Sequence, residues 1–257
     1  MLKITFGDYF LKLTLKTNKM FSMILDLIKN ELYLKKSDSI LFIQKKLEKV
    51  AGTLLNEYVL IVANNPFRLF EIEFYYHSSV HPDPFVHKHS QQLTKGRWYF
   101  HKKGAIYRPG IYRGVDLTFG DEDSKTYGGI LIRGIVNPEN QKDYVYGPAK
   151  CVDHIRESIG HGIEEVDDKA ATKSECPHLY LEKKELPEEQ VISGPRVGLP
   201  VRPADHLSNM FRYAHYRYII YPQLPHKGKE ALIAPGLLMK GSTKEEINRL
   251  FGYRILR

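Results

Sequence analysis

Hydrophobic and polar residues alternate along residues 69–77, LFEIEFYYH. An alternation of period two is typical of a β-strand, because successive side chains point to opposite faces of a sheet. One face of this strand is strongly apolar. The other face carries two carboxylates and a phenol, contributed by Glu71, Glu73 and Tyr75. The pattern predicts a strand and leaves open whether its polar face is a catalytic site, a metal site or an ordinary sheet edge.

Other segments show helical or strand periods. A helical period covers ILFIQKKLEKVAGTLL, and MFSMILDLIKNELYLKK predicts an amphipathic helix packed outside the core. Pro148 and Gly160 bound a predicted helix over 149–159, and a capping box at 242–246 predicts a short C-terminal helix. Strands are expected at 58–63, 69–76, 105–107, 115–119, 129–135 and 211–221, and surface loops at EEVDDKAATKSE and LEKKELPEEQ.

The overall charge favours a polyanionic partner. The chain has 257 residues, with 38 Lys and Arg against 30 Asp and Glu, and its net charge is +8. Such a balance is typical of proteins that bind nucleic acid or an anionic membrane. Lysines interrupt each apolar stretch near the N-terminus, so no signal peptide or membrane span is expected. Cys151 and Cys176 fit no paired-cysteine motif, which indicates a reducing, intracellular setting.

The distribution of the positive charge favours nucleic acid over membrane. No Asp or Glu occurs between Pro84 and Val115, where basic residues alternate with aromatic ones. Basic groups can neutralise phosphates, and flat rings can stack on bases. A second cluster, FRYAHYRYIIYP, repeats this composition, and neither cluster forms an amphipathic helix with a clean apolar face. The alternative is a solvated basic face over a few core aromatic residues.

Four histidines follow the acidic strand in HSSVHPDPFVHKHS. His87 and His89 would point to the same side of a strand, and His77 or His81 could then complete a metal site. Two prolines in this segment instead favour a loop whose histidines need not converge. A metal-dependent nuclease is therefore kept only as an alternative.

Several segments, in order, resemble the alkyladenine (3-methyladenine) DNA glycosylase family, whose members hydrolyse the bond between a damaged purine and its deoxyribose. The resemblance covers roughly residues 45–221. The matching segments are EIEFY, HS at 89–90, GAIY at 104–107, IY at 111–112, GGILIRGIVNPE at 128–139, GPAK at 147–150, GPRVGLP at 194–200 and HYRYII at 215–220. Each segment is weak alone, and their shared order gives the signal its specificity.

The resemblance implies that Glu73 is the general base and that Tyr75 stacks on an extruded base. A carboxylate beside the sugar can activate water and can stabilise the positive charge that develops as the base departs. Glu71 is the less suitable base of the pair. No metal or cofactor is expected in this mechanism. The competing interpretation of Glu73 is a surface glutamate on an edge strand.

The resemblance also implies which residues contact the base and the duplex. His89 is the expected partner of the base because serine follows it, and His87 is the alternative. Tyr112 matches the wedge that enters the duplex beside the flipped nucleotide. The remaining base contacts are expected from Tyr107, Pro109 and Arg133, and the DNA contacts from Lys102, Lys103, Arg108, Arg113 and Lys150, the last at a helix N-terminus. Arg217 is expected to brace the fold.

The expected fold is mixed α/β (α+β), a single domain around a curved, largely antiparallel β-sheet with peripheral helices, as the resemblance implies. Residues 1–38 form a helical N-terminal extension, 39–222 the glycosylase-like domain, and 223–257 a C-terminal extension. We expect a monomeric cytoplasmic enzyme, nuclear in a eukaryote, that binds double-stranded DNA and no membrane. A non-catalytic nucleic-acid-binding module is the principal alternative.

One departure from the family pattern bears on the substrate. Pro109 stands where the family usually has a tyrosine that stacks on the opposite face of the flipped base. Stacking is worth about 1–3 kcal/mol, so binding of flat cationic purines should weaken. The longer polar loop between His77 and His89 instead favours an enlarged modified base, such as a glycosylated hydroxymethylpyrimidine of viral DNA. The enzyme would then be a defence factor, and conventional alkylpurine repair is the alternative.

Overall fold

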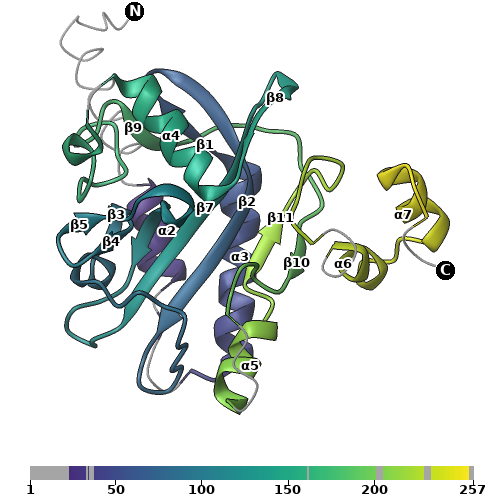
Figure 1. Cartoon of the computed structure of the whole chain (residues 1–257), viewed down its shortest axis with the longest axis horizontal. Coiled ribbons are helices and arrows are strands. Elements are labelled where there is room, and N and C mark those ends of the chain that lie inside the picture. The colour runs from purple at the N-terminus through teal and green to yellow at the C-terminus, as the bar shows by residue number, and fades with distance from the viewer. Residues whose placement is uncertain are drawn as a thin grey trace, which may run out of the picture.

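The computed structural model describes residues 23–32, 34, 38–160, 162–200, 205–228 and 233–254. An open antiparallel sheet of nine strands dominates this part of the chain (Figure 1). The strands of this sheet are β1 (Tyr58–Val62), β2 (Asn65–His77), β3 (Lys95–Phe100), β6 (Val115–Phe119), β7 (Tyr127–Asn137), β8 (Asn140–Tyr146), β9 (Leu179–Lys183), β10 (Ile192–Gly194) and β11 (Arg217–Ile219). The expectation of a mixed α/β fold with an antiparallel sheet is thereby confirmed.

Strand β2 lies in the centre of this sheet. The main path runs β10-β11-β2-β7-β6-β3, while β1 pairs with β2 and β9, and β8 pairs with β7. A tight turn joins β1 to β2, and its residues Ala63 and Asn64 have φ of 46° and 70°. Such left-handed residues match the twist of a hairpin. The second sheet is the small hairpin of β4 (Lys102–Lys103) and β5 (Ile106–Tyr107).

Helices cover the two faces of the sheet unequally. The core face carries Ile72, Phe74 and Tyr76 of β2, all buried, and packs against α3 (Ile40–Glu57). Helix α2 (Met23–Glu31) packs on β3 and β9. Helix α4 (Pro148–Ile159) lies against one end of the opposite face, beside β7 and β8 (Figure 1). The rest of that opposite face is free to carry polar groups.

The ends of two helices follow the sequence signals. Helix α4 begins at Pro148 and ends at Gly160, whose φ of 68° is the left-handed conformation expected of a C-cap. Helix α7 (Lys244–Phe251) begins with a capping box between Thr243 and Glu246. Both predictions are confirmed. In the ranges described above, no helix is long and apolar enough to cross a membrane.

The predicted strand at 211–221 is wrong in its first half. Helix α5 (His206–Tyr213) occupies that part, with the Asp205 side chain accepting a hydrogen bond from the Ser208 amide at its N-terminus. This cap stabilises the first turn of the helix and outweighs the strand preference of Phe211 and Tyr213. Within 211–221, only β11 is a strand.

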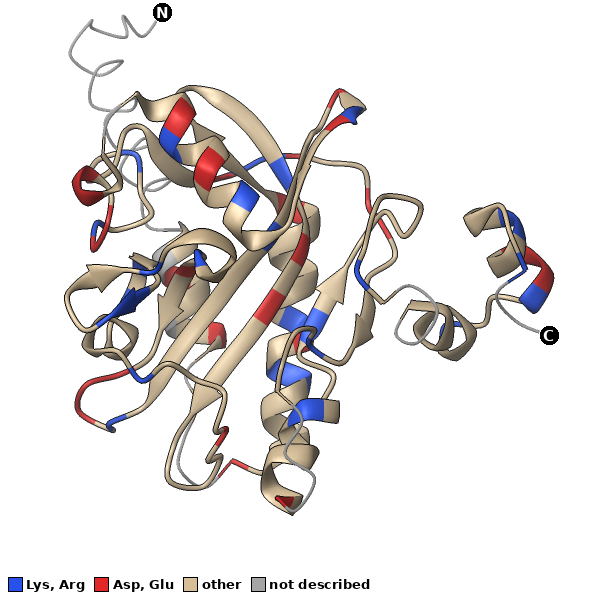
Figure 2. Ribbon diagram, viewed as in Figure 1, with Lys and Arg blue, Asp and Glu red and all other residues tan. Residues whose placement is uncertain are grey.

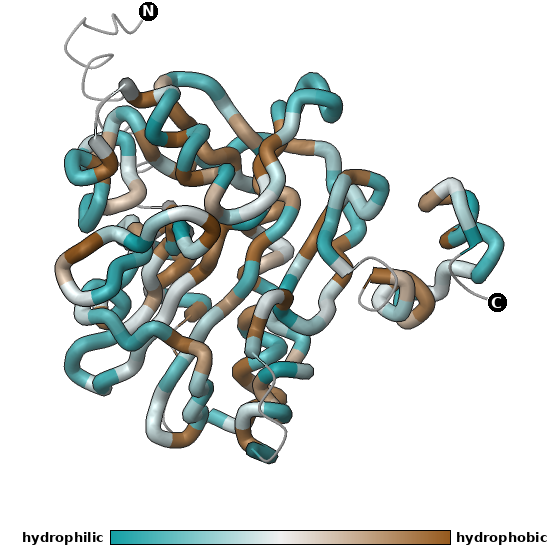
Figure 3. The backbone as a smooth tube through the Cα atoms, in the orientation of Figure 1, coloured by the Kyte–Doolittle hydropathy of each residue, from teal (hydrophilic) through white to brown (hydrophobic). Residues whose placement is uncertain are grey.

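The predicted loop LEKKELPEEQ is also partly a strand, because β9 includes Leu181–Lys183 and pairs with β1. Strands β3, β8 and β10 had no clear alternation in the sequence. Figure 3 shows that β8 is largely hydrophilic, as expected for a hairpin that projects into solvent.

The first and last described segments pack on the main sheet. Ile24, Ile28, Leu32 and Leu34 belong to the main core cluster, and residues 1–22 of the expected N-terminal extension lie outside the described part. At the other end, α6 (Ala234–Met239) and α7 form a small cluster with Ile192 and Ile219. The remaining short helices are η1 (Ser90–Leu93), η2 (Gly110–Tyr112) and η3 (Ile163–Glu165).

Candidate active site

The strand register places acidic groups in one row across the polar face of the sheet. Glu73 on β2 pairs with Leu131 on β7, and Leu131 pairs with Asp116 on β6. Paired residues of an antiparallel sheet point to the same face, so Glu73 and Asp116 share a face with one strand between them. Two strand spacings amount to about 10 Å. Figure 2 shows the acidic part of β2 in the middle of the sheet.

Glu71 is enclosed by a cationic network. Its Oε1 accepts hydrogen bonds from Nε of Arg133 at 2.7 Å and Nε of Arg217 at 3.0 Å. Its Oε2 lies 2.6 Å from Nδ1 of His226. Burial alone would raise the pKa of Glu71, but the His226 hydrogen bond and the two guanidinium charges outweigh it and lower this pKa to about 2. Glu71 therefore acts as a structural anion, and Arg217 braces the fold.

Glu73 has a different set of contacts. Its Oε1 accepts a hydrogen bond from the Val197 backbone amide at 2.9 Å and lies 3.4 Å from Nε of Arg133. Its Oε2 accepts a hydrogen bond from the Tyr75 hydroxyl at 2.8 Å. The side chain is fully buried in a central strand, so the interpretation as a surface glutamate on an edge strand is wrong. Two hydrogen bonds, from the Val197 amide and the Tyr75 hydroxyl, and the nearby Arg133 cation hold this carboxylate in a fixed orientation.

Tyr75 connects the carboxylate to a cavity. The Arg196 guanidinium lies 4.5 Å from the centre of the Tyr75 ring, and a 2.7 Å ion pair with Asp83 anchors Arg196. Burial, and then the neighbouring Glu73 carboxylate, raise the pKa of Tyr75 well above its usual value. The hydroxyl therefore stays protonated and donates to Glu73.

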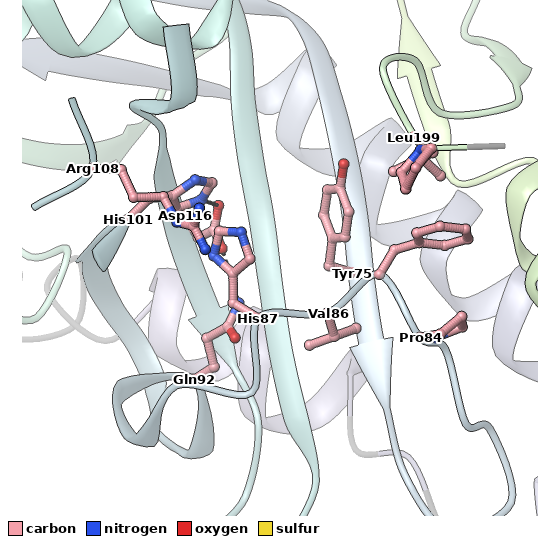
Figure 4. A pocket seen from close by; sticks show the side chains of 11 residues that line it. Tyr75, Pro84, Val86, His87, Gln92, His101, Arg108, Asp116 and Leu199 are labelled. Carbon is pink, nitrogen blue, oxygen red and sulfur yellow. Dashed lines mark hydrogen bonds and ion pairs between the residues drawn. The ribbon is translucent and has the colours of Figure 1, made fainter. Parts of the chain in front are cut away.

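The cavity beside Tyr75 has a volume of about 520 Å³. In Figure 4, Tyr75 lies on one side of it, and His87, His101 and Asp116 face Tyr75 from the other. Its size is within the range of small-molecule sites. The full lining consists of Tyr75, Pro84, Phe85, Val86, His87, Gln92, His101, Arg108, Asp116, Leu199 and Pro200.

A histidine and a carboxylate are paired in the cavity wall. His101 Nε2 lies 2.8 Å from Oδ1 of Asp116, and Gln92 Nε2 donates to Oδ2 of the same carboxylate at 3.1 Å. Both glycines beside the pair are needed. A Cβ at Gly114 would lie 2.5 Å from the His101 ring, and a Cβ at Gly129 would lie 2.4 Å from Asp116 Oδ2. The backbone is thus shaped around these two side chains.

The four histidines of the loop do not converge. His77 contacts the Asp83 carbonyl, and buried His81 lies between the Tyr76 carbonyl and the Tyr216 hydroxyl. Among the described residues, no group of three or more His, Cys, Asp or Glu could hold a metal ion.

The structure places His87, and not the preferred His89, in the cavity lining. The His89 ring stacks on Tyr99 with the centroids 4.9 Å apart, and its Nδ1 caps η1. His87 is exposed at the cavity mouth, where partial desolvation and then the neighbouring His101 lower its pKa to about 4. His87 therefore presents a neutral ring to the cavity.

Some residues that were expected to contact the base or the DNA are paired with other side chains of the protein. Lys102 Nζ forms an ion pair with Asp167, and the Tyr107 hydroxyl donates to the same carboxylate at 3.0 Å. Arg113 is paired with Asp153 of α4 at 2.8 Å. Arg108 instead lines the cavity. Lys102 and Arg113 thus brace the β4–β5 hairpin and the following turn.

The predicted wedge lies on an exposed projection. Tyr112 is 66% exposed and its neighbour Ile111 is 82% exposed, both in η2. Pro109, which precedes η2, and Lys103 are exposed on the same projection. Lys150 is exposed in the first turn of α4. The projection thus presents the large side chains of Tyr112 and Ile111 to solvent.

The sequence analysis missed several residues of this site. His101 and Asp116 come together only through the pairing of β3 with β6, and 15 positions separate them in the chain. Val197 and Arg196 reach Glu73 and Tyr75 from more than 100 positions away. Both residues lie in GPRVGLP, a segment of the resemblance for which no function was predicted.

Comparison with known proteins gives one informative match. No protein-family profile matches the chain. An uncharacterized protein of Acanthamoeba polyphaga mimivirus is 32% identical over 201 residues, which cover 71% of this chain and 89% of the viral protein. The match extends over most of both chains. This chain therefore belongs to the same family as that mimivirus protein.

Proposed function

We propose that the protein is a monofunctional DNA glycosylase that flips a modified base and hydrolyses its N-glycosidic bond. The observation that carries this proposal is the fixed Glu73 carboxylate, which adjoins Tyr75 at the wall of a 520 Å³ cavity. Glu73 takes a proton from water, whose oxygen attacks the sugar carbon C1′. Arg133, 3.4 Å away, helps to orient the carboxylate.

The cavity has the chemistry to receive a flipped base. Tyr75 offers an aromatic surface to stack on the base, and Arg196 stabilises that ring from behind. His87 faces the ring across the cavity (Figure 4). In this arrangement the base lies between Tyr75 and the histidines, while Tyr112 enters the duplex from the exposed η2 turn.

The polar lining favours a base that carries additional polar groups. Gln92 and Arg108 lie along the cavity and have N–H groups that can donate hydrogen bonds, and His101 adds an imidazole to the lining. Pro109 follows the lining residue Arg108 in the chain, lies outside the lining and offers no aromatic ring to a bound base. We propose a base enlarged by a polar substituent, such as a hydroxymethylated or glycosylated pyrimidine of viral DNA, and hence a role in defence.

Mass analysis of the material released from defined DNAs tests this proposal. Duplexes carrying glycosylated hydroxymethylcytosine, hydroxymethylcytosine, 3-methyladenine or hypoxanthine are incubated with the protein, and released bases and strand integrity are followed. We expect release of the enlarged pyrimidine with the strand intact. Preferential release of the small alkylated purine would indicate conventional repair. Binding without release would indicate a non-catalytic module, and strand cleavage that a chelator abolishes would indicate a nuclease.

The variant Pro109→Tyr tests the role of the cavity space. A tyrosine at this position, next to the lining residue Arg108 in the chain, would supply the second stacking surface. We expect it to lower release of the enlarged base and to raise release of a small flat purine by about tenfold, as one stacking contact allows. Unchanged selectivity would show that Pro109 does not determine which base is released.

A further inference from the structure

Arg108 differs from the other basic residues around the β4–β5 hairpin. It is the only Lys or Arg in the described lining of the cavity. Most of the Lys and Arg side chains between residues 95 and 113 are paired with a carboxylate, and Lys103 is exposed. The pairs are Lys95–Asp121, Arg97–Asp168, Lys102–Asp167 and Arg113–Asp153. Arg108 is half-buried, yet within the described part of the chain it forms no ion pair.

Contacts within the hairpin hold Arg108 in place and leave the end of its side chain available. Its backbone amide donates to the His101 carbonyl at 2.9 Å, and its Nε donates to the Lys102 carbonyl at 3.3 Å. Neither Nη group donates a hydrogen bond to any described residue. In Figure 4, Arg108 lies on the same side of the cavity as His101 and Asp116, across from Tyr75. The two Nη groups of a guanidinium form a planar fork that matches the two oxygens of a carboxylate.

We propose that this fork binds an acidic substituent on the flipped base, so that the enzyme releases a pyrimidine that carries a carboxylate. The inference rests on the proposed glycosylase function and deepens it by naming the class of substrate. A base stacked on Tyr75 directs its far edge toward the wall that contains Arg108. A hydroxymethyl group offers Arg108 one neutral acceptor, whereas a carboxylate offers two charged ones. Hydrogen bonds of this charge-assisted kind are about twice as strong as neutral ones.

The other polar groups of the lining do not supply this countercharge. Asp116, the only acidic residue in the described lining, has its two oxygens engaged by His101 at 2.8 Å and by Gln92 at 3.1 Å. Partial desolvation, and then the neighbouring His101, lower the pKa of His87 to about 4, so the His87 ring is neutral at pH 7. A carboxylate enclosed without a cation is strongly disfavoured. Arg108 is therefore the residue that allows an acidic base to enter.

A phosphate of the DNA backbone is the other anion that Arg108 could meet. Exposed Lys103, on the same hairpin, lies outside the lining and suits a backbone contact, whereas Arg108 lies where the proposed base is received. The two contacts differ in their dependence on the substrate. A phosphate contact contributes equally to every DNA, while a contact to the base contributes only when the substituent is present.

Two duplexes that differ only in the substituent of one cytosine test the proposal. One carries 5-carboxylcytosine and the other 5-hydroxymethylcytosine, and single-turnover release is measured for the parent and for Arg108→Gln. The ratio of parent to variant rate is taken on each DNA, because this ratio removes the difference in intrinsic reactivity between the bases. We expect a loss of about tenfold or more on the carboxylated DNA and of less than about twofold on the other. Arg108→Lys, which keeps the charge without the fork, should be intermediate.

Lys103→Gln is the matched control for the loss of a cation, and it should slow release from both DNAs equally. Chemical denaturation of each variant checks that the fold is kept. Equal loss on both DNAs in Arg108→Gln would assign Arg108 to the backbone and overturn the proposal. An unchanged rate on the carboxylated DNA would also overturn it, as would release of purines but of neither pyrimidine by the parent.

Failure of the proposed function gives a different result, namely no release of any base from any DNA. The affinities of the parent and of Arg108→Gln for the two duplexes then test the Arg108 site by itself. A preference of the parent for the carboxylated duplex that is lost in the variant would support an acidic ligand. Equal affinities of the parent for the two duplexes would overturn it.

Discussion

Two fully buried carboxylates on one face of β2 have different surroundings. We call the Glu71 side the closed end and the Glu73 side, next to the cavity residue Tyr75, the open end. At the closed end, Glu71 is surrounded by Arg133, Arg217 and His226, and each of its oxygens is engaged by a cation or an imidazole. At the open end, Glu73 is held by an amide and a phenol beside a cavity. The two residues are chemically identical and two positions apart.

The contacts of the two carboxylates suit them to different roles. Glu71 is a fixed anion whose low pKa suits it to hold Arg133 in place. Glu73 also lies near Arg133, at the longer distance of 3.4 Å. It is hydrogen-bonded to Tyr75, the tyrosine of β2 in the described cavity lining. The contacts of the closed end suit it to stabilise the fold and to position the guanidinium, and under the proposed function the chemistry takes place at the open end.

The largest effect is expected from removing the charge at the closed end. Glu71→Gln leaves Arg133, Arg217 and His226 without their shared anion in a buried site. Breaking a buried ion pair on one side costs about 3–5 kcal/mol, so the free energy of unfolding should fall by a similar amount. Chemical denaturation of this variant measures the loss, with exposed Glu185→Gln as the control. A loss below about 1 kcal/mol would contradict a structural role for Glu71.

Acid denaturation also tests the contribution of Glu71 to stability. Because the folded pKa of Glu71 is about 2, below its usual value of 4.5, its contribution to stability is present above pH 4.5. That contribution should disappear as the pH falls from about 4.5 to about 2. Denaturation midpoints measured across this window should fall less steeply in Glu71→Gln than in the parent. Parallel curves for the two proteins would show that Glu71 contributes nothing to this part of the acid sensitivity.

A smaller effect is expected at the rim of the open end. Tyr112→Ala removes the side chain that would fill the space left by a flipped nucleotide. Excision from duplex DNA should fall by about tenfold or more, while excision from single-stranded DNA should change little. Ile111→Ala is a neighbouring control of similar exposure. Equal loss on both substrates would mean that Tyr112 is structural.

The smallest effect concerns the salt dependence of DNA binding. Exposed Lys103 should contact phosphate, so Lys103→Ala should lower the slope of log K against log salt by about one unit. Lys102 and Arg113 are paired within the protein, and their replacement should affect stability more than the slope. Lys184→Ala, on an exposed surface after β9, serves as control. If the slope is unchanged in Lys103→Ala, the DNA contacts a different surface of the protein.

The sequence predicted those features that depend on short spacings. The alternation in β2 assigned its two faces, since a strand directs odd and even positions to opposite sides. The ends of α4 and α7 followed from their caps. Helix α5 was misassigned because aromatic residues favour strands, whereas the Asp205 cap determined the local structure.

Features that depend on contacts between residues far apart in the chain could not be predicted from the sequence. The choice between His87 and His89 depends on the path of the loop, which Asp83 fixes through Arg196, 113 positions away. Likewise, the proximity of His101 and Asp116 follows from the register of β3 and β6. Periodicity carries no information on which strands become neighbours, so the pairing of His101 with Asp116 could not be recognised from the sequence.

Base excision by Glu73→Gln tests the central claim most directly. Glutamine keeps the shape of the side chain and an oxygen for the Tyr75 hydroxyl, but it cannot take a proton from water. On the DNA that the parent processes best, we expect affinity close to that of the parent and a single-turnover rate lowered by at least about 100-fold. Excision retained at the parent rate in this variant, with normal affinity, would contradict the assignment of Glu73 as the catalytic base.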